Sequence, residues 1–112
     1  MDKVIIKRDG LPPLTFTGCI IGEGVGATSA GRRTAIKIYR TKGGKFIAMI
    51  HRHTQWDKER HSAEAASFVT AAEVIDFLKQ GNDKLGELSQ EAVEKAAKES
   101  PEFAAAWIEV VE

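Results

Sequence analysis

The alternation of apolar and polar residues is clearest over residues 34–56. Two runs rich in β-branched and aromatic residues, 34–41 and 45–56, flank a Lys-Gly-Gly segment. Such runs on either side of a glycine pair predict a β-hairpin. A three-residue loop with Gly44 in the left-handed conformation then sets the register. The predicted cross-strand pairs are Arg40–Phe46, Ile38–Ala48 and Ile36–Ile50.

In this register the hairpin has two unlike faces. One face is apolar and suits a core; it carries Ile36, Ile38, Phe46, Ala48 and Ile50. The other face is half polar; it carries Lys37, Tyr39, Lys45, Ile47, Met49, His51 and His53. Because the second face still holds large apolar and aromatic side chains, we expect another element or a partner to cover part of it.

The flanking segments predict further strands. Residues 3–7 and 14–21 are apolar runs separated by a turn signal at Asp9. We expect Cys19 to pack as a small hydrophobe in or near this structure. Residues 62–69 suit either a helix or an edge strand, and a strand is favoured for part of the range.

A glycine-rich segment, residues 22–33, is predicted to be a long loop that is either functional or disordered. Its glycines follow a G-x-G-x-G pattern: Gly22, Gly24 and Gly26. Backbone amides in such a loop can cradle a phosphate. However, a dinucleotide site needs a helix directly after the glycines, and a phosphate-loop ATPase needs Gly-Lys-Ser/Thr. A flexible connection is therefore the alternative, while Arg32 and Arg33 keep an anion-binding role open.

Helical periodicity dominates from Thr70 onward. Thr70 and Glu73 form a capping box, and Gly81 is predicted to end this first helix. A second helix is predicted from a cap at Ser89 through Lys98, with a thin apolar face.

Ser100 and Pro101 predict the start of a third helix. Its wide apolar face comprises Phe103, Ala104, Trp107, Ile108, Val110 and Val111. We expect this face to be buried on the sheet or against another chain. Strands first and helices afterwards predict an α+β fold. It would hold an antiparallel sheet of three to five strands in residues 3–69, with a central hairpin over 34–54, and three helices in 70–111 packed on one face.

Composition and length suit a single domain, residues 1–112, in a soluble protein. The chain is 43% hydrophobic and 29% charged, which is typical of globular proteins. No apolar run approaches the roughly 20 residues of a membrane span. A single cysteine excludes an internal disulfide and favours a reducing cytoplasm.

Charge is divided between a β-rich basic half, 1–69, and a helical acidic half, 70–112. Residues 1–60 hold twelve Lys and Arg against five Asp and Glu, a net charge of +7. Residues 61–112 hold four against eleven, a net charge of −7. Such asymmetry favours an anionic partner for the basic half. The alternative is that the two halves pair with each other across the fold.

His51 and His53 are two apart on a predicted strand, so both rings project from one face. Such a pair can ligate a metal, but a zinc site needs at least a third protein ligand. The candidates are Cys19, Asp57, Glu59 and His61, none at a diagnostic spacing. The alternative is two partly exposed polar residues, and an enzymatic base at either histidine would also need an oriented carboxylate and a substrate pocket.

The basic hairpin is the stronger feature. Its predicted anion-binding residues are Arg32, Arg33, Lys37, Arg40, Lys42, Lys45 and Arg52. Tyr39 and Trp56 add aromatic surfaces, and basic ribbons with aromatic rings can follow a phosphate backbone. The alternative is that these charges keep an exposed sheet soluble.

No motif is specific enough to name a reaction, so we expect a non-enzymatic binding or accessory module without a cofactor. Its partner is expected to be nucleic acid or another polyanion, held by the basic hairpin. One alternative is a protein-interaction or homodimerisation module. A metal-dependent enzyme using His51 and His53 is the least favoured alternative.

Overall fold

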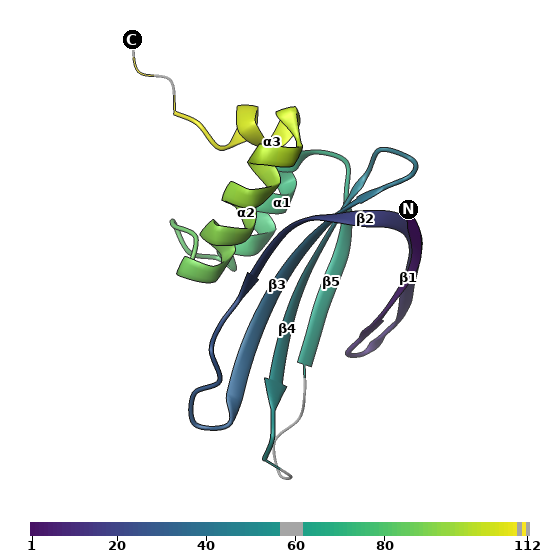
Figure 1. Cartoon of the computed structure of the whole chain (residues 1–112), viewed down its shortest axis with the longest axis vertical. Helices are drawn as coiled ribbons and strands as arrows, with labels where there is room; N and C mark the ends of the chain where they lie inside the picture. The colour runs from purple at the N-terminus through teal and green to yellow at the C-terminus, as the bar shows by residue number, and fades with distance from the viewer. Residues whose placement is uncertain (57–61, 110, 112) are drawn as a thin grey trace.

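The structure is a computed structural model that describes residues 1–56, 62–109 and 111. It confirms the α+β class: an antiparallel sheet followed by three helices (Figure 1). The strands are β1 (Asp2–Arg8), β2 (Leu11–Val25), β3 (Arg32–Thr41), β4 (Phe46–Thr54) and β5 (Ser62–Phe68). The helices are α1 (Ala71–Lys79), α2 (Glu87–Glu99) and α3 (Pro101–Ala106). Within the described residues, none of these helices is long and apolar enough to cross a membrane.

The central hairpin, β3–β4, has the predicted register. The pairs Arg40–Phe46, Ile38–Ala48 and Ile36–Ile50 are all present. The Thr41 amide donates to the Lys45 carbonyl over 2.8 Å. Gly44 has a φ of 82°, the left-handed conformation that closes a three-residue hairpin loop with little strain.

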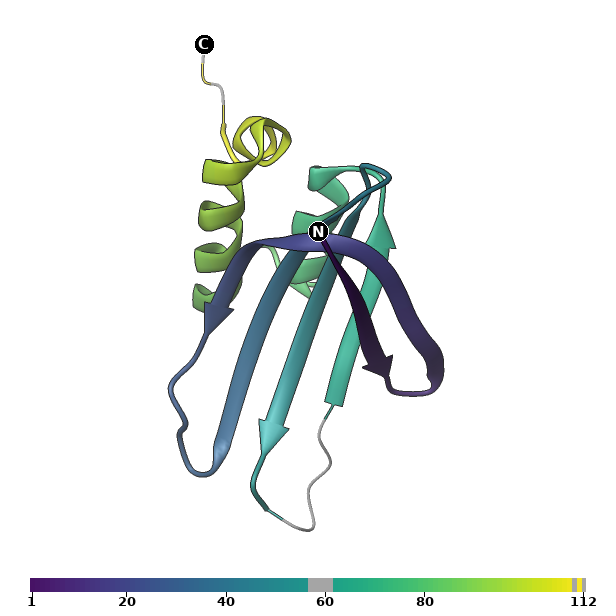
Figure 2. The same ribbon diagram turned by 45° about the vertical axis from the view of Figure 1, so that its right-hand side comes forward.

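The five strands follow one another in the sheet in chain order, and the helices pack on one face (Figures 1 and 2). The main core lies between them and contains the predicted apolar face of the hairpin. Helix α1 begins at the predicted capping box, in which the Glu73 amide donates to Thr70 Oγ1 over 3.2 Å. The Phe103 ring of α3 meets Phe46 of β4 edge-on, with the ring centroids 5.0 Å apart.

The opposite face of the sheet is partly covered by the β1–β2 hairpin, because the long strand β2 arches over it (Figure 2). A second apolar cluster forms there around Ile6, Ile47 and Ala65, with Val4, Leu14, Phe16, Tyr39 and Met49 packed against it. This confirms that another element covers part of the half-polar face.

Hydrogen bonds link the end of β1 to β5. The Asp9 amide donates to the Ala63 carbonyl over 3.3 Å, and the Ala63 amide donates to Asp9 Oδ2 over 3.4 Å. Arg8 Nη1 donates to the Ala65 carbonyl over 3.2 Å. These bonds hold β1 over the sheet without a continuous β1–β5 ladder.

The predicted loop over residues 22–33 is wrong in its extent. Strand β2 continues to Val25 and β3 begins at Arg32. The glycines favour a loop in a prediction from sequence because glycine is a poor strand former. In the folded chain, pairing with β3 and packing against α2 outweigh this weak propensity.

Two helix boundaries also differ from the prediction. Helix α2 starts at Glu87 with Gly86 as its N-cap, so Ser89 is a buried residue inside the helix rather than its cap. Helix α3 ends at Ala106, and Phe103 is its buried residue. Ile108 and Val111 are 68% and 83% exposed. The chain leaves the helices here (Figure 1), so the predicted face is not buried as a whole on the sheet. Val110 lies outside the described residues, and burial against another chain stays a prediction.

Candidate functional site

The predicted basic residues do not form one patch. Strand alternation places Arg33 and Lys37 on the face that the β1–β2 hairpin partly covers. The same alternation places Arg32, Arg40 and Arg52 on the helix side, while Lys42 and Lys45 lie at the hairpin tip. Arg33 and Arg40 are seven residues apart along β3, or about 23 Å. A single ligand head group therefore cannot contact the whole predicted set.

Two of these residues already face carboxylates. Lys37 Nζ lies 3.9 Å from Glu23 Oε2, and Arg52 Nη1 lies 3.5 Å from Glu64 Oε2. The Arg52 pair joins the neighbouring strands β4 and β5 within the β-rich half, so pairing between the two halves stays a prediction. Both pairs are substantially exposed, so each contributes only about 0.2–1 kcal/mol to stability.

Gly22 and Gly24 lie in a strand that packs directly on a helix. A Cβ atom added to Gly22 would lie 2.2 Å from the Ala92 carbonyl oxygen, and one added to Gly24 would lie 2.1 Å from that of Leu88. Their role in the fold is thus to let α2 approach β2, and a phosphate-binding loop at these two positions is excluded. Gly26 follows β2, and its amide donates to the Thr34 carbonyl over 3.0 Å.

His51 and His53 are neighbours, with ring centroids 6.0 Å apart. The candidate ligands Asp57, Glu59 and His61 lie outside the described residues. Across the residues that are described, no group of three potential metal ligands comes together.

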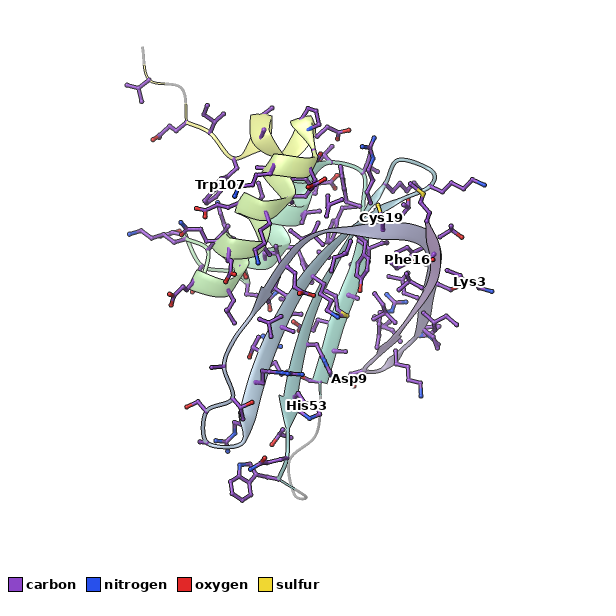
Figure 3. All side chains as sticks on the ribbon, viewed as in Figure 1. Lys3, Asp9, Phe16, Cys19, His53 and Trp107 are labelled. Carbon is purple, nitrogen blue, oxygen red and sulfur yellow. The ribbon has the colours of Figure 1, made fainter. Side chains whose placement is uncertain are left out.

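Cys19 cannot join the two histidines at a metal. It lies opposite Arg40, whereas His53 lies opposite Arg33, so about 23 Å of strand separates the two positions (Figure 3). Cys19 is also exposed, which overturns its predicted packing as a small hydrophobe. Cys19 lies beside the exposed Arg40, near the β3–β4 turn, and this position explains its exposure.

A groove of about 450 Å³ lies between β1 and the uncovered part of the β3–β4 face. Its floor is formed by Lys37, Tyr39, Met49 and His51. Its wall is β1 and the following residue, from Val4 to Asp9, and Ser62 and Ala63 close one end. In Figure 3, Asp9 and His53 mark the same end of the sheet. The groove falls within the size range of small-molecule sites.

The second apolar cluster holds the groove in shape. Tyr39 meets Phe16 of β2 edge-on, with ring centroids 5.2 Å apart. Val4 and Ile6 of β1 join Tyr39 and Met49 in the same cluster. The floor and the wall therefore come from segments that are 28 or more residues apart in the chain, and their side chains pack against one another.

Cationic groups are part of the groove lining. Lys37 is a floor residue, and Lys7 and Arg8 belong to the wall, with Asp9 as a single acidic neighbour among the described lining residues. Burial raises the pKa of the Tyr39 hydroxyl above 10.0, and the negative charge of Glu23 raises it further. Tyr39 is therefore a neutral phenol at physiological pH, able to donate or accept a hydrogen bond.

Of the seven predicted basic residues, Lys37 alone lines this groove. Lys42 and Lys45 line a separate hollow of about 660 Å³, between the hairpin tip and residues Leu14–Thr17 of β2. Sequence reasoning missed the whole β1 wall. The one signal that pointed to it was the half-polar face of the hairpin, which required a covering element.

Comparison of the chain with protein-family models, with curated proteins and with solved structures finds no significant match.

Proposed function

We propose that this chain is a non-enzymatic binding module for an anionic ligand with an apolar or aromatic body, and that the groove beneath β1 is its site. The observation that carries this proposal is the combination, in about 450 Å³, of apolar and aromatic lining residues with Lys37, Lys7 and Arg8. Ligand sites are typically apolar pockets with a few polar or charged groups that orient the ligand.

Each groove residue has a physical role in this proposal. Lys37 contacts the anionic group, since its side chain is 34% exposed and its ammonium supplies up to three hydrogen bonds. Tyr39 and His51 offer ring faces and hydrogen bonds to the body of the ligand. Met49 gives a polarisable apolar surface that adapts to its shape.

A nucleotide combines both parts of such a ligand, with a phosphate for Lys37 and a base for Tyr39 and Met49. Arg33 lies on the same sheet face as Lys37, four residues along β3. When a single strand binds with one phosphate at Lys37, Arg33 is therefore a second cation for a neighbouring phosphate, about 13 Å from Lys37 along the strand. The proposed ligand is therefore a nucleotide, either free or as one unit of a single strand.

The test is an amide NMR titration of labelled protein with uridine monophosphate and with a short oligouridylate, at low and at moderate salt. We expect shifts along β1 and at Lys37, Tyr39 and Met49. Shifts that extend to Arg33 with the oligomer alone would identify a strand as the ligand. A loss of affinity as salt increases would report the phosphate contacts.

Two variants locate the site. Lys37→Ala is expected to weaken binding about tenfold, since a charge-assisted contact is lost. Lys45→Ala removes the same charge from the same hairpin but outside the groove, and should leave the affinity unchanged. Absence of binding at low salt, or equal losses in both variants, would contradict the groove as the binding site.

A second candidate function, self-association, is favoured by the exposed residues after α3. Ile108 and Val111 are apolar and mostly exposed, and exposed apolar segments often mark interfaces. Sedimentation equilibrium should then show a mass that rises with concentration in the natural chain. The change should disappear when Ile108 and Val111 are both replaced by serine, and a monomer at all concentrations would remove this candidate.

A further inference from the structure

Glu23 faces the groove side of the sheet because of a bulge in β2. The β2–β3 register pairs Ile20 with Tyr39 and then Gly22 with Ile38, so Ile21 is the extra residue. Without this extra residue, strand alternation would turn Glu23 toward the helices. The bulge instead places it directly opposite Lys37, at 3.9 Å.

Glu23 neutralises the lysine on the groove floor without closing the groove. Its own side chain is 42% exposed and does not belong to the groove lining. An exposed ion pair of this kind adds little to stability. Its larger effect is electrostatic, because a fixed carboxylate beside Lys37 lowers the positive potential that an anionic ligand meets.

The Glu23 carboxylate is free to leave Lys37 because it is largely in contact with solvent. Its side chain is 42% exposed and its distance to Lys37 Nζ is 3.9 Å. A carboxylate displaced from Lys37 therefore remains hydrated and loses little energy.

We infer that Glu23 is an internal competitor for the ligand's anionic group, and that the ligand is a phosphate monoester which displaces it from Lys37. This inference rests on the proposed function of the groove. A ligand carboxylate would have to displace a tethered group of equal charge, and tethering gives that group a high effective concentration. A phosphate monoester carries about −1.5 to −2 charges at pH 7 and three acceptor oxygens, so it outcompetes a single carboxylate.

The test measures the affinity of uridine monophosphate for the natural chain, Glu23→Gln and Glu64→Gln. We expect Glu23→Gln to bind about threefold to tenfold more tightly, because a negative charge near the phosphate is removed. Glu64→Gln is the matched control: it removes the same charge from an exposed ion pair, with Arg52, outside the groove lining. Its affinity should equal that of the natural chain.

A fourth variant separates competition for Lys37 from a general electrostatic effect. In a Lys37→Ala background, Glu23→Gln should no longer raise the affinity, since there is no lysine to release. A gain that persists there, or an affinity unchanged by Glu23→Gln alone, would overturn the inference while leaving the groove as the site. Failure of uridine monophosphate to bind any of the variants would overturn the proposed function as well.

A comparison of two small anions tests the ligand class. Phenyl phosphate should bind the natural chain more tightly than benzoate, which has the same ring and a carboxylate. Glu23→Gln should raise the affinity for both anions, because each then meets a Lys37 that no carboxylate occupies. Benzoate binding as tightly as phenyl phosphate in the natural chain would contradict a phosphate monoester.

Discussion

A Cβ atom added to Gly24 of β2 would lie 2.1 Å from the carbonyl oxygen of Leu88 on α2. Real Cβ atoms do not approach a backbone oxygen so closely, so glycine is required wherever the helix crosses the strand. The same contact recurs at Gly22, against Ala92. This stripe of glycines brings α2 onto the sheet and thereby sets one boundary of the main core.

Replacing Gly24 by alanine should therefore destabilise the protein. We expect a loss of about 1–3 kcal/mol in the free energy of unfolding, as for other overpacked contacts, measured by urea denaturation. Gly43→Ala is the control, since a Cβ there would meet no atom closer than 3.9 Å. Equal stability of the two variants would show that α2 does not pack on β2 as described.

The Tyr39 hydroxyl should titrate above pH 10. Tyr39 is the single tyrosine of the chain, so the phenolate absorbance reports it alone. Burial, and then the charge of Glu23, raise its pKa, and Glu23→Gln should lower it. A pKa that Glu23→Gln leaves unchanged would show that the Glu23 charge does not reach the groove floor.

The raised pKa of Tyr39 also changes how the stability of the protein depends on pH. The folded protein holds the phenol proton more tightly than the unfolded chain does. Below pH 10 the group is neutral in both states, and the free energy of unfolding does not depend on it. As the pH rises from 10 through the higher folded pKa, stability should fall. Tyr39→Phe should remove this part of the alkaline destabilisation, and an unchanged alkaline profile would contradict the assignment.

Arg8→Ala should loosen the wall of the groove. The variant loses the bonds from Arg8 to the carbonyl oxygens of Ala65 and Pro12, which measure 3.2 and 2.9 Å. We expect a loss of about 1 kcal/mol and faster hydrogen exchange at the Ala63 amide, which bonds to Asp9. Lys3→Ala removes the same charge from the same strand and should change neither quantity.

Phe103 and Ile108 should differ sharply in their effect on stability. Phe103 is fully buried and meets Phe46 edge-on, so Phe103→Ala should cost about 3–5 kcal/mol. Ile108 is 68% exposed, so Ile108→Ala should remain within about 0.5 kcal/mol. A large loss at Ile108 at low protein concentration would mean that the chain buries the segment after α3.

Much of the local structure could be predicted because its signals are local. The β3–β4 register follows from a side-chain period of two and from Gly44, and both features act within the hairpin itself. The start of α1 follows from Thr70 and Glu73, three residues apart. The candidate site was predicted only in part: Lys37 lies in the groove, whereas alternation along β3 separates it from Arg32 and Arg40.

The amino-acid sequence by itself therefore determined the order of the elements, the central register and the unlike faces of the hairpin. Only the tertiary structure decided that β2 carries a bulge at Ile21, that its glycines lie under α2, and that β1 folds over the sheet to form the groove. The physical reason is distance along the chain. Gly24 meets Leu88 and Asp9 meets Ala63, and contacts between such distant residues outweigh the weak local preferences of a glycine-rich strand.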